Sequence, residues 1–117
     1  MPTMHVTTTT GRTLEEKKAL VLALTDCIEN ALKRPREIIR VVFHEIPGNS
    51  YAVAGEMLNG KMDTMVNVLI IEGRTREQKD DLSNQVIAAV QSVPAFTGGP
   101  IRAFIHEVEK ESFKRTA

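Results

Sequence analysis

The feature that most constrains the fold is an internal repeat. Shifting the 117-residue sequence by 62 positions aligns residues 1–55 with residues 63–117 without a gap, and 12 of these 55 pairs are identical. A register that holds through several separated motifs indicates duplication of one structural unit. We therefore expect one domain over residues 1–117, with its two units at 1–60 and 63–117. The identical pairs include Gly11-Arg12-Thr13 with Gly73-Arg74-Thr75, Ile39-Arg40 with Ile101-Arg102, and His44-Glu45 with His106-Glu107.

Each half of the repeat predicts a strand, a helix and a second strand. In the first half, residues 4–10 and 38–46 have strand character, and apolar residues recur at helical spacing between Leu14 and Leu32. Thr13 and Glu16 form a capping-box pattern at the start of that helix, and Pro35 marks its end. In the second half, strands are expected at 65–71 and 101–108, and the pattern from Thr75 to Gln78 repeats the capping box.

The order of these elements predicts an α+β fold. A β-α-β crossover makes its two strands parallel and leaves the helix on one face. Two such units side by side give a four-stranded sheet with both helices on the same face. The opposite face carries apolar residues and has no helix to cover it, so we expect a closed homo-oligomer to bury it.

Composition excludes several classes of partner. Fifteen basic residues balance fifteen acidic ones, which gives no support for nucleic acid as a partner. No apolar run reaches the length of a membrane span, and no signal-peptide pattern is present, so a cytoplasmic location is expected. His5, His44 and His106 lack the local spacing of metal ligands, and we expect neither a metal nor a cofactor. The single Cys27 fits a small core residue.

Pro2 is the first residue that suggests chemistry. Removal of Met1 would expose its nitrogen as a secondary amine. Burial or nearby arginines would lower the pKa of such an amine below the usual range of about 7.7–8.0. The uncharged amine could then act as a general base. A Met-Pro start alone carries no catalytic meaning, so this interpretation depends on the neighbouring residues.

Arginines at equivalent positions of the repeat are the second suggestive feature. Arg12 and Arg74 follow the first strand of each unit, and Arg40 and Arg102 open the second. Arginine offers a planar fork of donors that suits carboxylates. The set therefore predicts a small-molecule carboxylate substrate. Alternatively, these arginines pair with Glu15, Glu77 or Glu45 on the surface.

Together these motifs resemble the 4-oxalocrotonate tautomerase family. The resemblance is carried by Pro2, Gly11-Arg12-Thr13, Arg40 and the segment from Tyr51 to Glu56, and it covers nearly the whole chain. Members of that family are single β-α-β units about half this length, and the present chain resembles the fused form. The resemblance implies a homotrimer and a tautomerase acting on enol or keto acids such as 2-hydroxymuconate or phenylenolpyruvate.

The resemblance also implies roles for particular residues. Pro2 would be the general base, and Arg12 and Arg40 would bind the carboxylate and polarise the keto or enol oxygen. Tyr51 would line an apolar pocket. Because sites of this family combine residues of neighbouring units, Arg74 or Arg102 would complete the site that Pro2 begins. Thr64 stands where the repeat predicts a second proline, so each chain would carry one catalytic amine.

Other branches of the superfamily remain as alternatives. Arg74 and Arg76 resemble the arginine pair of malonate semialdehyde decarboxylase, although the aspartate expected near residues 37–40 is absent. For cis-3-chloroacrylic acid dehalogenase, Phe104 replaces a tyrosine and Arg115 replaces a water-activating glutamate. We include Phe104 and Arg76 among the candidate substrate-binding residues. A trimeric binding protein without activity is the non-enzymatic alternative.

Overall fold

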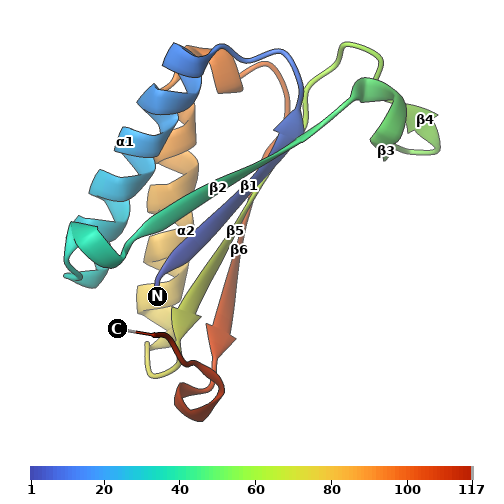
Figure 1. The fold of residues 1–117 in the computed structure, drawn as a ribbon. Coiled ribbons are helices and arrows are strands. Elements are labelled where there is room, and N and C mark those ends of the chain that lie inside the picture. Colours follow the sequence, from blue (N-terminus) through green and yellow to red (C-terminus); the bar gives the residue numbers. More distant parts are fainter. Residues whose placement is uncertain (117) are drawn as a thin grey trace.

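The structure, a computed structural model, describes residues 1–116. Two β-α-β units follow one another in the chain, joined by a projecting arm (Figure 1). Besides the helices and strands, the two units contain three 3-10 turns: η1 (Arg36–Ile38), η3 (Pro94–Phe96) and η4 (Lys110–Ser112). The first unit contains β1 (Thr3–Thr9), α1 (Leu14–Leu32) and β2 (Arg40–Ile46). The second contains β5 (Thr64–Ile71), α2 (Arg76–Gln91) and β6 (Ile101–Val108). The arm contains η2 (Gly48–Ser50), β3 (Ala52–Val53) and β4 (Glu56–Met57).

Both helices begin at the predicted capping boxes. The Thr13 hydroxyl accepts the Glu16 backbone N–H at 3.1 Å, and the Glu16 carboxylate accepts the Thr13 N–H at 2.8 Å. Thr75 and Gln78 form the same pair of bonds at 3.1 and 2.8 Å. Each box satisfies two backbone donors that have no partner inside the helix. This local signal therefore fixes where each crossover helix begins.

The sheet joins the two units through their first strands. Its order is β2-β1-β5-β6, with β1 parallel to β2 and β5 parallel to β6. The central pair, β1 and β5, is antiparallel, and Thr3 lies opposite Leu69. The beginning of β1 therefore lies beside the end of β5. This arrangement decides which residues of unit two can approach Pro2.

The core lies between the sheet and the two helices, which cover the same face (Figure 1). Its fully buried side chains include Met4 and Val6 of β1, Leu24 of α1 and Val86 of α2. Each such apolar side chain contributes about 1.5–3 kcal/mol by its removal from water. The expected α+β architecture with both helices on one face is confirmed.

The other face of the sheet is less apolar than expected. On β1 and β2, His5 Nδ1 lies 2.8 Å from His44 Nε2, and the two rings stack. On β5 and β6, His106 Nε2 lies 2.7 Å from Asn67 Oδ1. These polar pairs occupy equivalent positions of the repeat, and exposed Phe104 lies beside His106. No helix among residues 1–116 covers this mixed face.

Several boundaries differ from the sequence-based expectation. Ile38 belongs to η1, so β2 begins at Arg40 and not at residue 38. The β3–β4 hairpin was not predicted, because strands of two residues are too short for a periodic pattern. The arm projects from the body at the upper right of Figure 1.

No helix among the described residues is long and apolar enough to cross a membrane.

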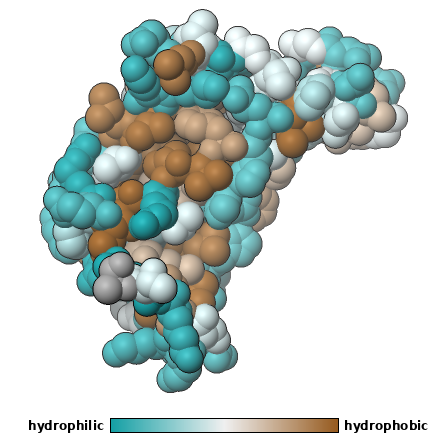
Figure 2. Space-filling view, in the orientation of Figure 1, coloured by the Kyte–Doolittle hydropathy of each residue, from teal (hydrophilic) through white to brown (hydrophobic). Residues whose placement is uncertain are grey.

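Apolar side chains also reach the surface between α1 and β2. In Figure 2, hydrophobic residues gather where these two elements meet and are rimmed by hydrophilic ones. Leu14, Val21, Leu22 and Phe43 line a shallow groove there, together with two lysines. Leu14 and Leu22 are exposed because they lie on the flank of α1 that faces away from the core. This groove contains none of the predicted site residues.

Candidate active site

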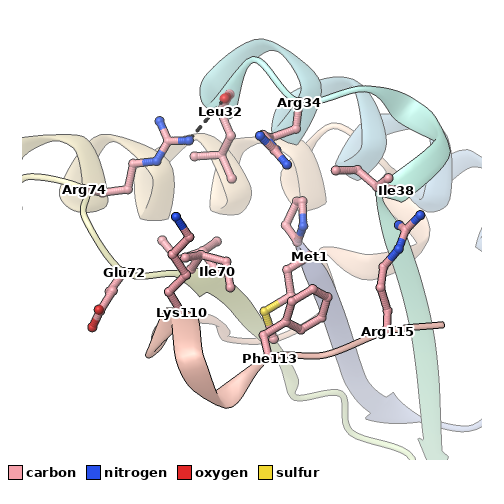
Figure 3. Close-up of a pocket in the computed structure, with 12 residues that line it drawn as sticks. Met1, Leu32, Arg34, Ile38, Ile70, Glu72, Arg74, Lys110, Phe113 and Arg115 are labelled. Atoms are coloured by element: carbon pink, nitrogen blue, oxygen red, sulfur yellow. Dashed lines mark hydrogen bonds between the residues drawn. The ribbon is translucent and has the colours of Figure 1, made fainter. Parts of the chain in front are cut away.

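The N-terminal end of β1 opens into a cavity of about 540 Å³ (Figure 3). Apolar side chains of several elements form much of its wall, and charged side chains stand among them. A second cavity of about 480 Å³ shares Met1, Ile38, Phe113 and Arg115 with it. An apolar cavity with a few convergent charged groups is the usual form of a small-molecule site. Its lining residues are Met1, Pro2, Leu32, Arg34, Ile38, Ile70, Ile71, Glu72, Arg74, Lys110, Phe113 and Arg115.

Pro2 is held firmly at this position. It is buried, and its carbonyl oxygen accepts the backbone N–H of Arg40 at 3.2 Å. Met1 precedes it in the structure, so the Pro2 nitrogen is an amide here. The free amine at Met1 lies in the same cavity. The strand pairing that orders β1 therefore also fixes the start of the chain within the cavity.

Arg74 reaches this cavity from the second unit. It follows β5, and the antiparallel pairing of β1 with β5 brings that end of β5 beside Pro2. Its Nη2 donates to the Leu32 carbonyl at 3.3 Å, near the end of α1. This bond leaves other guanidinium donors of Arg74 available to a ligand. Pro2 and Arg74 are thus brought together within one chain.

The cavities are strongly cationic although the chain as a whole is neutral. Five cationic side chains line them, namely Arg34, Arg40, Arg74, Lys110 and Arg115, against only two carboxylates, Glu37 and Glu72. The pKa of the N-terminal amine is lowered from its ordinary 8.0, first by burial and then by the charges of Arg115, Arg34 and Arg40. Each cause disfavours the protonated ammonium. The environment therefore favours a neutral amine, which can accept a proton.

Arg12 lies away from Pro2 at the opposite end of β1. The seven residues of β1 separate the two by about 23 Å at roughly 3.3 Å per residue. Arg12 Nη1 donates to the Ala95 carbonyl at 3.2 Å and lies 3.3 Å from the Met62 sulfur. Arg12 thus binds a carbonyl just after α2 of unit two, in the same way that Arg74 binds a carbonyl at the end of α1 of unit one. One chain therefore does not bring Arg12 and Pro2 together.

Arg102 is already paired with a carboxylate. Its Nη1 contacts Asp63 Oδ1 at 2.9 Å and Oδ2 at 3.1 Å, while the Tyr51 hydroxyl donates to Oδ1 at 2.8 Å. The pKa of Tyr51 is raised to about 12, first by burial and then by the hydrogen bond to Asp63 and its charge. Asp63 is the repeat equivalent of Met1, and Arg102 is the equivalent of Arg40. In unit two, the arginine equivalent to Arg40 is therefore neutralised by a carboxylate of the same chain.

Two further predicted site residues lie outside the cavities. Arg76 is the first residue of α2 and is exposed. Phe104 lies on the open sheet face, opposite Asn67 of β5. Neither lines the cavity that contains Pro2. Of the carboxylates offered as alternative partners of the arginines, Glu45 binds Lys17 at 2.8 Å instead.

Sequence reasoning missed several residues of the cavity. Arg34 follows α1, and Lys110, Phe113 and Arg115 come from the segment after β6. The repeat offered one signal, because Phe113 is the equivalent of Tyr51. Arg34 and Lys110 have no repeat partner of the same kind, since Phe96 and Gly48 stand at the equivalent positions. Within residues 1–116, no group of three His, Cys, Asp or Glu side chains converges as a metal site.

Comparison with known proteins agrees with this arrangement. The sequence model of the tautomerase enzyme family matches residues 2–61, half of the chain. A probable tautomerase of Ralstonia nicotianae is 44% identical over 55 residues, which are 47% of this chain and 79% of the relative. The 2-hydroxymuconate tautomerase of a Pseudomonas species, strain CF600, is 34% identical over 56 residues, which are 48% of this chain and 89% of the relative.

The fused architecture also has a counterpart among solved structures. A fused 4-OT solved as a symmetric trimer superimposes with a TM-score of 0.85 at 28% identity. The match covers 97% of this chain and 91% of that one, and so includes both β-α-β units. The family match, these relatives and the cationic cavity at Pro2 agree: the chain belongs to the tautomerase family and is an enzyme of that family in its fused, two-unit form.

Proposed function

We propose that this enzyme catalyses the ketonisation of small unsaturated 2-hydroxy acids such as 2-hydroxymuconate or phenylenolpyruvate. The observation that carries the proposal is the position of Pro2, which lies buried in a cationic cavity with apolar walls. Removal of Met1 would turn the Pro2 nitrogen into the free amine of that cavity. The relative from strain CF600 is named for 2-hydroxymuconate, which makes this compound the first substrate to test.

In the proposed reaction the Pro2 nitrogen accepts the proton of the enol hydroxyl. Negative charge then develops on the substrate oxygen and spreads over the conjugated carbons. The protonated Pro2 then returns a proton to carbon, which completes the conjugated ketone and restores the neutral amine. The reaction therefore needs no oxidant and no cofactor. Arg74 and Arg40 line the cavities beside Pro2. Their fixed positive charges would stabilise the dienolate as it forms.

Arg12 requires a second copy of the chain if it is to act on the same substrate. Within one chain it lies at the far end of β1, and Arg74 occupies the place beside Pro2. We propose a homotrimer, supported by the uncovered sheet face and by the trimeric fused relative. In such an assembly the arm and the open face would contact neighbouring copies. Each chain would contribute one amine, since Thr64 replaces the second proline.

The direct test compares wild type with Pro2→Ala in assays of both enol acids. Intact mass is measured first, so that only chains that have lost Met1 are compared. We expect kcat/KM to fall about 100-fold, toward the lower end of the range for a general base, because the alanine variant would still present a primary amine. Chains that retain Met1 should be much less active than chains that have lost it, since their Pro2 nitrogen is an amide and their free amine is displaced by one residue. Equal rates for wild type and Pro2→Ala would remove Pro2 from the mechanism.

A further inference from the structure

The arginines of this chain fall into two groups according to their partners. Four of the eight make side-chain hydrogen bonds within residues 1–116, namely Arg12, Arg36, Arg74 and Arg102. The other four are Arg34, Arg40, Arg76 and Arg115, whose side chains have no such bond and no ion pair in that part of the chain. Three of these four, all except Arg76, line the two cavities at Met1. Like charges gathered without a carboxylate partner suit an anionic ligand.

Arg115 is distinguished from the rest by its position. It lines both cavities, and it is the largest charge contribution to the lowered pKa of the N-terminal amine. Figure 3 shows Arg74 and Arg115 on opposite sides of the cavity, with Met1 and Phe113 between them. Leu32, Ile38 and Ile70 supply apolar wall between these charges. The arrangement suits an elongated ligand that carries a negative charge at each end.

The repeat gives an independent reason to expect an anionic ligand beside Arg40, in the cavity that Arg40 shares with Arg115. In unit two, the segment that contains Tyr51 packs on Asp63, whose carboxylate binds Arg102. In unit one, the equivalent segment contains Phe113 and lies at Met1, beside Arg40. The position of Asp63 corresponds to Met1 in unit one, and methionine carries no carboxylate, so the removal of Met1 leaves this place without an anion as well. The first unit therefore keeps its cations and lacks the internal anion that neutralises the copy in the second.

We propose that Arg115 binds the distal carboxylate of the substrate and makes the enzyme prefer dicarboxylic enol acids to monocarboxylic ones. This inference rests on the proposed function and assigns a specificity-determining residue to the same site. The carboxylate next to the enol is bound by Arg74, across the cavity from Arg115. A guanidinium without an internal partner can give two parallel hydrogen bonds to that second carboxylate.

The test compares two enol acids that differ in the second carboxylate. 2-Hydroxymuconate carries one at each end, whereas phenylenolpyruvate carries a phenyl ring at the distal end. Kinetics are measured at the pH plateau, where the amine is neutral in every variant. Arg115→Gln should raise KM for 2-hydroxymuconate about 10- to 100-fold, the loss typical of a hydrogen bond to a charged group. The change for phenylenolpyruvate should stay within about threefold of wild type on the same reasoning, because it lacks the bonded group.

Two further variants separate specificity from general effects. Arg115→Lys keeps the charge without the planar fork and should recover part of the loss. Lys114→Gln removes one positive charge from the next residue, which is exposed and lines neither cavity. It should behave as wild type. Equal losses for both substrates in Arg115→Gln, or an equal effect of Lys114→Gln, would overturn the proposal.

Failure of the proposed function can be recognised separately. If the wild type turned over neither enol acid, binding of cis,cis-muconate would be measured by calorimetry. This diacid lacks the enol hydroxyl but keeps both carboxylates. Weaker binding by Arg115→Gln than by Lys114→Gln would support a carboxylate-binding role for Arg115 even then. Equal affinities, or no binding by wild type, would refute it.

Discussion

The Asp63 carboxylate offers the clearest quantitative perturbation outside the cavity. Its side chain is 3% exposed and receives three contacts, from the Tyr51 hydroxyl at 2.8 Å and from Arg102 Nη1 at 2.9 and 3.1 Å. Asp63→Asn keeps the shape of the side chain and removes its charge. A hydrogen bond to a charged group contributes about 1.5–3 kcal/mol. Because Arg102 is 49% exposed, water replaces part of that interaction.

We therefore expect Asp63→Asn to lower the free energy of unfolding by about 2 kcal/mol. Urea titrations of wild type and variant at one protein concentration measure this difference, since association would shift the midpoint. Asp80→Asn is the matched control. Asp80 is exposed on α2, has no ion pair within residues 1–116, and should change stability by less than about 0.5 kcal/mol.

Tyr51 supplies a second measurement on the same variant. The chain has one tyrosine and no tryptophan, so the phenolate absorbance that appears at alkaline pH reports the ionisation of Tyr51 alone. In wild type the pKa of Tyr51 is about 12, and Asp63→Asn should move it toward its ordinary 10.0, because the acceptor loses its charge. The folded pKa is raised, so the stabilisation is complete below pH 10 and is lost as pH rises through 12. An unchanged titration together with unchanged unfolding would refute the role given to Asp63.

Three further predictions concern other parts of the molecule. Thr64→Pro restores the proline of the repeat but removes the N–H bond to the Pro100 carbonyl and the buried hydroxyl contact with Thr8, and should cost about 2–5 kcal/mol in urea unfolding. Thr64→Val, which keeps the N–H, should cost less; equal costs would contradict this account. The charge of Arg34 helps to lower the pKa of the Met1 amine, and the same effect is expected on the Pro2 amine, so Arg34→Gln should move the acid limb of kcat/KM to higher pH. Arg36→Gln, whose arginine binds Asp26 and Glu29, should leave that limb in place. Burial, followed by the charge of Asp81, raises the pKa of Cys27 to about 11, so iodoacetamide should modify the folded enzyme at pH 8 far more slowly than the urea-unfolded chain. Comparable rates would show that the thiol is accessible.

Local signals in the sequence were sufficient to predict the two helices and the four strands of the main sheet. Thr13 and Thr75 begin helices in the structure because a capping box depends only on residues three positions apart. The repeat predicted two equivalent units, and the four-stranded sheet follows from their shared pattern. The capping boxes depend on residues a few positions apart and the repeat on the match between the two halves, so both can be recognised without knowing the three-dimensional contacts.

The composition of the site depended on contacts that no local pattern encodes. The antiparallel pairing of β1 with β5 places Arg74 beside Pro2 and leaves Arg12 at the other end. The sequence shows two equivalent arginines and cannot tell which of them approaches Pro2. The segment after β6 has no periodic pattern, so Arg115 was noticed only as a departure from the dehalogenase. Asp63 was missed because a single carboxylate between two units carries no motif.

The central claim is that the Pro2 nitrogen is a neutral base at the working pH. The most direct measurement is a titration of ¹⁵N-labelled proline by NMR, on chains shown by mass to lack Met1, beside the pH dependence of kcat/KM. The acid limb of that profile reports the essential base of the free enzyme. Burial and neighbouring arginine charges lower the pKa of the Met1 amine in this cavity from its ordinary 8.0. The account predicts the same direction for the Pro2 amine, with one pKa below 8.0 in both experiments. A Pro2 nitrogen that titrates at or above 8.0, away from a lower kinetic limb, would contradict it.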